Sequence, residues 1–123
     1  MYLIDSDVLI DFLKGKNETV KILGKIKPNQ RSTSIICVGE ILEGLTDNKK
    51  EQFQKLLNII NIYNVDIKVI VIFAEIRKEL RKNGNLIDNF DILIASTCLV
   101  YDLILITNNL KHFERIEGLK IFK

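Results

Sequence analysis

Two patterns of apolar and polar positions alternate along the chain. Short stretches with strand propensity at residues 2–4, 32–35 and 103–107 predict strands, and a last edge strand is expected at 119–122. Between them lie longer segments in which apolar residues recur three and four positions apart, the spacing of an amphipathic helix. The first helix is expected to be capped by Ser6 or Asp7 and to end near Gly15, and the others to cover residues 20–26, 38–45, 50–60, 68–80 and 89–101.

The segment 68–80 fits both patterns. Its run Val69-Ile-Val-Ile-Phe73 has strand propensity. Its apolar residues nevertheless keep helical spacing, and the charged continuation from Glu75 to Lys82 requires a helix. We therefore predict a helix here.

Short strands that alternate with helices predict an α/β protein whose parallel sheet is covered by helices on both faces. No repeat, low-complexity tract or linker divides the chain, so a single domain over residues 1–123 is expected. Sites in such sheets form at the carboxyl ends of the strands. This rule brings Asp5, which follows the first strand, to the same edge as Thr107, Asn108 and Asn109, which follow a later one.

Composition narrows the class of protein. Hydrophobic residues make up 47% and charged residues 28% of the chain, the balance of a folded domain, and the net charge is only +2. Any attraction for nucleic acid must therefore come from the arrangement of the 18 Lys and Arg residues. The longest uncharged stretch, Ile92 to Tyr101, is about half of what a membrane span requires, so no membrane partner is expected.

The cysteines and the N-terminus predict a cytoplasmic protein. Cys37 and Cys98 stand far apart in apolar stretches, which predicts buried reduced thiols rather than a disulfide framework or a zinc site. The N-terminus carries no basic leader, and Asp5 stands where a signal peptide would remain apolar.

The sequence Asp5-Ser6-Asp7 stands at a predicted strand-to-helix turn. Side chains of this kind cap helices, because their oxygens accept hydrogen bonds from the free N–H groups of the first turn. Two of the three residues suffice for capping, which leaves the first carboxylate without a structural task.

Asp88 and Asp91 open the apolar helix at 89–101. Capping explains Asp88, with Asp91 three residues further on as in a capping box. A helix that is apolar on all sides is buried, however, and a carboxylate one turn into it must find a partner. A bound cation is a suitable partner for Asp91.

Glu40 lies opposite the apolar stripe of its helix on a helical wheel, which predicts a solvated face. Ile36 and Gly44 share that face and are not typical of full solvation, so a role in a site stays open. Carboxylates on three elements that meet at one sheet edge suit a hard cation such as Mg²⁺, which prefers oxygen ligands. Such an ion activates water for the hydrolysis of phosphodiesters.

Four segments of the sequence, in order and at suitable distances, resemble the motifs of one family. They are Tyr2-Leu-Ile-Asp-Ser-Asp-Val-Leu-Ile-Asp11, Ser34-Ile-Ile-Cys-Val-Gly-Glu-Ile-Leu-Glu-Gly44, Asp91-Ile-Leu-Ile-Ala95 and Ile106-Thr-Asn-Asn-Leu-Lys-His-Phe113. The family is that of the PIN-domain nucleases, and within it the VapC-type toxins. Each motif alone is weak, but the four together are specific.

The resemblance implies a PIN-like three-layer α/β/α fold with a central parallel sheet. It implies a Mg²⁺-dependent endoribonuclease, with Mn²⁺ able to replace Mg²⁺, that acts as the toxin of a toxin–antitoxin pair. The expected partners are an RNA substrate, a cognate antitoxin and a second copy of the chain in a homodimer.

The resemblance also implies the site residues. Asp5 and Asp91 correspond to metal ligands, and Glu40 and Asn109 complete the catalytic set. A further group is expected to contact substrate or its phosphates, namely Ser6, Thr107, Asn108, Lys111 and Arg115.

The chain departs from the family at three positions. Many relatives carry Asn where this chain has Asp7, and many carry Asp at or beside Asn109. Asp88 is an additional acid at a variable position. The three catalytic carboxylates are intact, and the number of bound ions stays open.

Basic residues fit an RNA substrate. A cluster from Arg77 to Lys82 lies on one predicted helix, where acidic neighbours explain it equally well as a solvated face. A second cluster, Lys111, His112 and Arg115, follows the last motif and adjoins the proposed site, which favours contact with phosphate.

Two alternatives stand beside the nuclease. A phosphoryl-accepting receiver domain has a similar length and sheet, but it requires an Asp after a central strand and a Lys after the last one, and no such pair stands at suitable places. A catalytically silent PIN fold that binds RNA or protein is the other alternative. Metal-dependent cleavage of RNA separates it from the enzyme.

Overall fold

The sheet consists of four short parallel strands. In the computed structural model, which describes all of residues 1–123, their order is β3-β2-β1-β4. Leu3 and Ile4 of the inner strand β1 are buried, because helices cover both faces of the sheet. The strands are β1 (Tyr2–Ile4), β2 (Arg31–Ser34), β3 (Asn61–Tyr63) and β4 (Ile104–Ile106).

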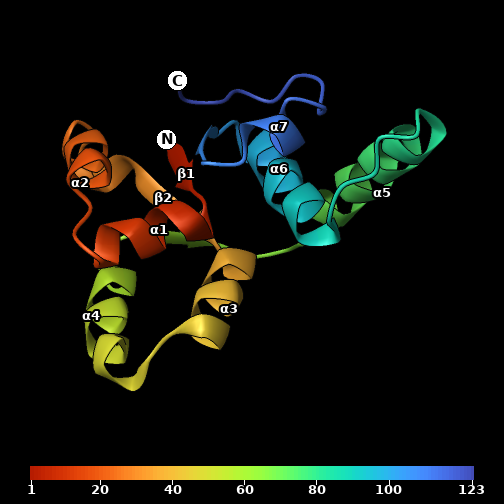
Figure 1. The fold of residues 1–123 in the computed structure, drawn as a ribbon. Helices are drawn as coiled ribbons and strands as arrows, with labels where there is room; N and C mark the ends of the chain where they lie inside the picture. The colour runs from red at the N-terminus through yellow and green to blue at the C-terminus, as the bar shows by residue number, and fades with distance from the viewer.

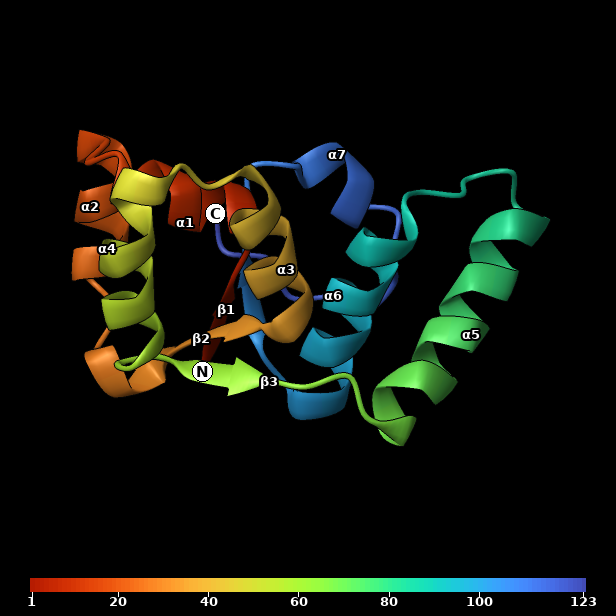
Figure 2. The same ribbon diagram turned by 90° about the horizontal axis from the view of Figure 1, so that it is seen from below.

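Helices flank the sheet on both sides. Figure 1 shows α1, α2 and α4 on one side and α6 and α7 on the other, and α5 packs against α6 on the outside of the molecule (Figure 2). None of them combines the length and apolar character that crossing a bilayer requires. The helices are α1 (Ser6–Leu13), α2 (Asn17–Gly24), α3 (Ile35–Gly44), α4 (Asp47–Leu57), α5 (Ile67–Lys82), α6 (Asn89–Tyr101) and α7 (Leu110–Phe113), with a 3-10 turn at Pro28–Gln30.

Two hydrophobic clusters lie on opposite faces of the sheet. Leu3 and Leu105 pack with α6 and α7 in one cluster, whereas Ile4 and Ile106 pack with α1, α2 and α4 in the other. This division follows from strand geometry, since successive side chains point to opposite faces. The predicted three-layer α/β/α fold with a central parallel sheet is confirmed.

The predicted helix at 68–80 is confirmed as α5, which is capped by Asp66. Two elements are missing from the sequence prediction. β3 is an edge strand whose Asn61 and Ile62 are exposed, so it shows no buried apolar run, and α7 is only a single turn.

Several predicted bounds are wrong. The edge strand expected at 119–122 is reduced to one bridge between Ile121 and Leu105. The predicted strand at 32–35 ends at Ser34, because Ser34 caps α3 and Ile35 is already helical. The helices α2 and α4 begin and end a few residues earlier than predicted, since their first turns are polar and carry no apolar spacing.

Candidate active site

Asp5 stands at the carboxyl end of β1 and is 2% exposed. Its Oδ1 accepts a hydrogen bond from the backbone N–H of Ser6 at 2.8 Å, so Asp5 is the N-cap of α1. Its Oδ2 accepts from the hydroxyl of Thr107 at 2.7 Å. The prediction that Ser6 or Asp7 caps the helix and leaves Asp5 without a structural task is wrong, because the extended backbone of Asp5 lets the helix begin at Ser6.

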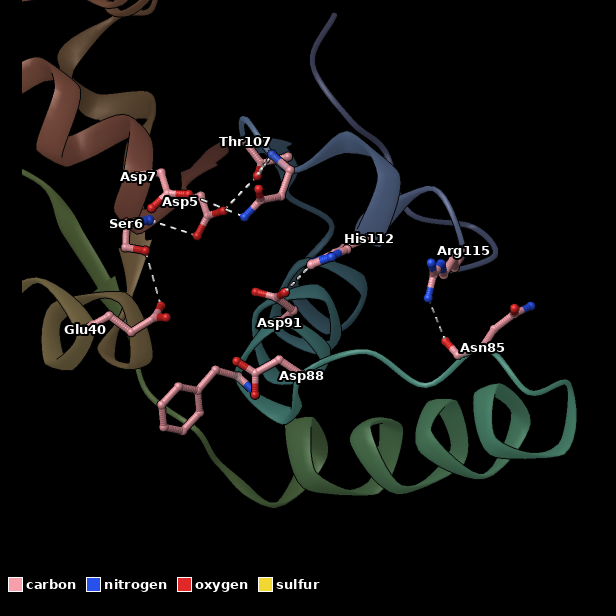
Figure 3. Close-up of polar contacts among 12 residues, drawn as sticks. Asp5, Ser6, Asp7, Glu40, Asn85, Asp88, Asp91, Thr107, His112 and Arg115 are labelled. Carbon is pink, nitrogen blue, oxygen red and sulfur yellow. Dashed lines mark hydrogen bonds and ion pairs between the residues drawn. The ribbon is translucent and has the colours of Figure 1, made fainter.

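Glu40 projects from α3 toward Asp5 and Ser6 (Figure 3). The hydroxyl of Ser6 donates to Glu40 Oε1 at 3.3 Å. The side chain is half-buried, so the predicted solvated face is wrong. The packing of α3 beside α1 closes this face of the helix, which a wheel for α3 alone does not register.

Cys37 lies next to Asp5 and Glu40. Its Sγ donates to Asp5 Oδ1 at 3.9 Å, and ligand atoms of Asp5, Cys37 and Glu40 all lie within 4.8 Å of one another. Burial, reinforced by the charge of Asp5, raises the pKa of the thiol to about 12. Cys37 and Cys98 are both free and buried, as the sequence predicts.

Asp91 enters the site from the first turn of α6. Its side chain is 13% exposed, and its Oδ2 lies 3.1 Å from Nδ1 of His112 on α7. The sequence places His112 in a basic cluster but gives no sign of this contact, which depends on how α7 packs on α6. A ring N–H from His112 orients the Asp91 carboxylate in the way that outer partners orient metal ligands.

Burial and mutual repulsion act on all three carboxylates. The pKa values of Asp5, Glu40 and Asp91 are raised, in each case chiefly by desolvation. Charges on neighbouring carboxylates raise them further, whereas the contact with His112 partly opposes the shift at Asp91. A bound cation would offset both the desolvation of the three carboxylates and the repulsion between them.

Residues 107–109, which follow β4, form the rest of the site at the carboxyl edge of the sheet. The backbone N–H of Asn109 donates to the hydroxyl of Thr107 at 3.0 Å, which ties Asn109 to the Asp5 network. Its side-chain amide donates to Asp7 at 3.3 Å, and the amide of Asn108 donates to Asp11 at 3.2 Å. Both asparagines therefore link this segment to α1.

The remaining predicted site residues lie apart from the carboxylates. Lys111 is exposed on α7. Arg115 turns toward the α5–α6 connection, where its guanidinium donates to the backbone oxygen of Asn85 at 3.4 Å (Figure 3). Asp88 is exposed and caps α6 through Phe90 N–H, as predicted.

The donor set fits a hard divalent cation. Carboxylate oxygens from three different elements face a common space, and Mg²⁺ and Mn²⁺ take such oxygen ligands together with water. Carboxylate oxygens predominate in this set, whereas zinc sites are built mainly from Cys and His ligands, so the set is not typical of zinc. Acidic groups in this arrangement are typical of phosphodiester hydrolysis.

Comparison with known proteins identifies the family to which this fold belongs. A PIN-domain family model matches residues 2–119. Ribonuclease VapC1 of Methanocaldococcus jannaschii is 36% identical, over 98% of this chain and 85% of that protein. The crystal structure of VapBC2 from Rickettsia felis bound to a promoter DNA fragment superposes with a TM-score of 0.89 at 26% identity, over 98% of this chain and 96% of that one. A toxin–antitoxin complex from Klebsiella pneumoniae superposes with a TM-score of 0.84 at 25% identity, over 100% and 97% of the two chains.

The chain therefore belongs to the PIN-domain family. Within that family, the relatives that match it over nearly its whole length include VapC ribonucleases. The family resemblance predicted from the four sequence motifs is confirmed.

Substitutions of Asp88 test whether this residue serves only as the N-cap of α6 or also takes part in catalysis. Asp88→Ala should lower the free energy of unfolding by about 0.5–2 kcal/mol, and Asp88→Ser should recover most of that loss, because a serine oxygen can accept the same N–H. RNA cleavage should fall only modestly in both variants. Thermal melts and cleavage rates measure the two effects. If Asp88→Ser abolishes cleavage without changing the melting temperature, Asp88 belongs to the active site and not only to the cap.

Proposed function

We propose that this protein is a metal-dependent endoribonuclease and the toxin of a toxin–antitoxin pair. The observation that carries the proposal is the convergence of Asp5, Glu40 and Asp91 at the carboxyl ends of the strands. The relatives named as VapC ribonucleases support the same activity. We further propose that the ion is Mg²⁺ and that Mn²⁺ replaces it, because the donors are oxygens.

Each residue has a distinct task in the proposed reaction. Asp5 and Asp91 would hold the ion, which when bound would supply the activation of a water and the charge stabilisation that phosphodiester hydrolysis needs. The raised pKa of Glu40 suits it to accept a proton from the attacking water. The hydroxyls of Ser6 and Thr107 hold Glu40 and Asp5 in place.

Further side chains are proposed to contact the RNA backbone. The amides of Asn108 and Asn109, which donate to Asp11 and Asp7 on α1, are proposed to donate to phosphate oxygens or their waters when RNA is bound. Lys111 is exposed on α7, where its charge would attract phosphates. Arg115 would have to leave Asn85 to contribute, so we assign it to RNA distant from the cleaved bond.

Removal of the metal tests the activity. The purified protein should cleave RNA in Mg²⁺, lose cleavage in EDTA, and regain it when excess Mg²⁺ or Mn²⁺ is added. Gel analysis of a labelled RNA measures cleavage, and a fluorescence anisotropy titration of the same RNA measures binding. RNA binding without cleavage in any metal would instead identify a silent PIN-fold RNA-binding module.

Two protein partners belong to the proposal. An antitoxin would cover the acidic edge and place a cationic side chain among the carboxylates, a charge-assisted contact that excludes metal. A second copy of the chain is proposed to cover the exposed apolar residues of α5, where Ile67 is 78%, Ile70 43% and Val71 51% exposed. Light scattering of the purified toxin would measure the mass of the dimer.

We place this activity in the cytoplasm. The two free, buried thiols of Cys37 and Cys98 suit a reducing compartment, and RNA is available there as substrate. Fractionation of cells that express the tagged chain would show where it resides.

A further inference from the structure

Asp7 carries a carboxylate that the capping of α1 does not use. Asp5 is the N-cap of this helix, so Asp7 in the first turn has no cap hydrogen bond to make. Asp7 is exposed and forms no salt bridge. Its one side-chain hydrogen bond is the one accepted from Asn109.

This contact orients Asp7 toward the active site. The Asn109 amide donates to Asp7 Oδ2 at 3.3 Å, while the backbone N–H of Asn109 donates to Thr107 and Thr107 donates to Asp5. Asp7 and Asp5 are thus linked through one continuous set of hydrogen bonds. Figure 3 shows Asp7 beside Asp5, on the side of the site where Thr107 also lies.

The charge of Asp7 reaches every member of the site. It raises the pKa values of Asp5, Glu40 and Asp91 alike. This repulsion places Asp7 within electrostatic range of the other three carboxylates. The favourable interaction of an acidic side chain with the N-terminus of α1 explains an acid in this turn, but not its bond to Asn109.

A second Asp–Asn pair, one turn along α1, shows the contrast. Asp11 accepts from the amide of Asn108 at 3.2 Å, much as Asp7 accepts from Asn109. Asp11, however, forms a salt bridge with Lys16 at 3.2 Å and is not among the leading causes of the pKa shifts of the three catalytic carboxylates. The chain therefore contains a neutralised pair outside the site and a charged pair beside it.

We propose that Asp7 is a fourth carboxylate of the divalent-cation site and that Asn109 is the residue that positions it. The inference rests on the proposed metal-dependent function. The Asp7–Asn109 pair carries a single negative charge, and that charge would help to hold the hydrated cation, either directly or through a water molecule. What the site requires is the charge within this pair, whichever partner carries it.

Exchange of the two residues tests the proposal. Asp7→Asn should weaken Mn²⁺ binding by about tenfold or more, the size of effect found when supporting groups of metal sites are removed. The double variant Asp7→Asn/Asn109→Asp returns the carboxylate to the pair and should recover affinity to within about threefold of wild type. Free Mn²⁺ measured by electron paramagnetic resonance gives the affinity without any need for catalysis, and circular dichroism confirms folding.

Asp11→Asn is the matched control, since it removes a carboxylate from the same helix and keeps an oxygen for Asn108. Its Mn²⁺ affinity should stay within about threefold of wild type. The proposal is overturned if Asp7→Asn binds Mn²⁺ as wild type does, if Asp11→Asn loses as much, or if the exchanged pair recovers nothing.

The same measurements separate this inference from the proposed function. Wild-type protein that cleaves RNA although Asp7→Asn keeps full Mn²⁺ affinity contradicts the inference alone. Wild-type protein that binds Mn²⁺ through Asp7 but never cleaves RNA contradicts the proposed activity alone. Protein that binds no Mn²⁺ contradicts both.

Discussion

Asp5→Asn and Asp91→Asn should each lower RNA cleavage by more than about a hundredfold while the protein stays folded. Asparagine preserves the volume of each side chain and removes the charge that would hold the cation. The introduced amide oxygen can still accept from the Ser6 N–H in the first variant and from His112 in the second, so the local contacts have a substitute. Single-turnover cleavage in saturating Mg²⁺ measures the loss. A variant that cleaves at the wild-type rate shows that the residue it replaces is not a ligand.

Although Asp91→Asn should lower cleavage, it should not lower the stability of the metal-free protein at neutral pH. The pKa of Asp91 is raised by burial, so the folded state keeps this proton at a pH where the unfolded chain has released it. The contribution that the protonated Asp91 makes to the stability of wild type is therefore lost as pH rises from the ordinary value of 3.8 through the raised pKa. Asp91→Asn lacks this loss, so in EDTA it should melt at or above the wild-type temperature at neutral pH.

Melts at acidic and neutral pH in EDTA test this sign. Well below the ordinary pKa of 3.8 the advantage of Asp91→Asn should vanish, because the Asp91 carboxyl of wild type is then protonated in both the folded and the unfolded state. Saturating Mg²⁺ should reverse the order at neutral pH, since it stabilises only the protein that binds it. A variant that is destabilised in EDTA at neutral pH would show that Asp91 stabilises the fold instead of opposing it.

Expression of the wild-type chain alone should arrest bacterial growth, and co-expression of the antitoxin encoded beside it should restore growth. RNA cleavage explains the arrest, and occupation of the acidic edge by a cationic antitoxin side chain explains the relief. Colony counts after induction measure both effects, which should reach several orders of magnitude. Asp91→Asn, expressed to the same level, is the control for the burden of expression.

The outcome of this experiment separates toxicity from mere overproduction. Growth arrest by Asp91→Asn as severe as that by wild type would show that toxicity does not depend on the active site. Unimpeded growth with abundant folded wild-type protein would contradict the role as a toxin, although it would leave the nuclease activity open to the test in vitro.

The architecture, and the edge of the sheet at which the site lies, follow from the sequence alone. Apolar stretches that alternate with helical spacing require a parallel sheet covered on both faces, and the carboxyl ends of its strands necessarily meet. Asp5 and Thr107, 102 residues apart, therefore share an edge in any such fold. The burial of Asp91 likewise follows from the apolar helix that it opens.

The direction in which individual side chains face the site depends instead on how the elements pack together. A periodic pattern describes the faces of one helix, whereas the contact of Ser6 with Glu40 joins residues 34 apart and requires α1 and α3 to lie side by side. The same holds for His112, which lies on α7 and faces Asp91, and for Arg115, which follows α7 and faces Asn85 instead of the carboxylates. Asp7 follows the same rule, since its place beside the site depends on Asn109, which approaches from the far end of the chain.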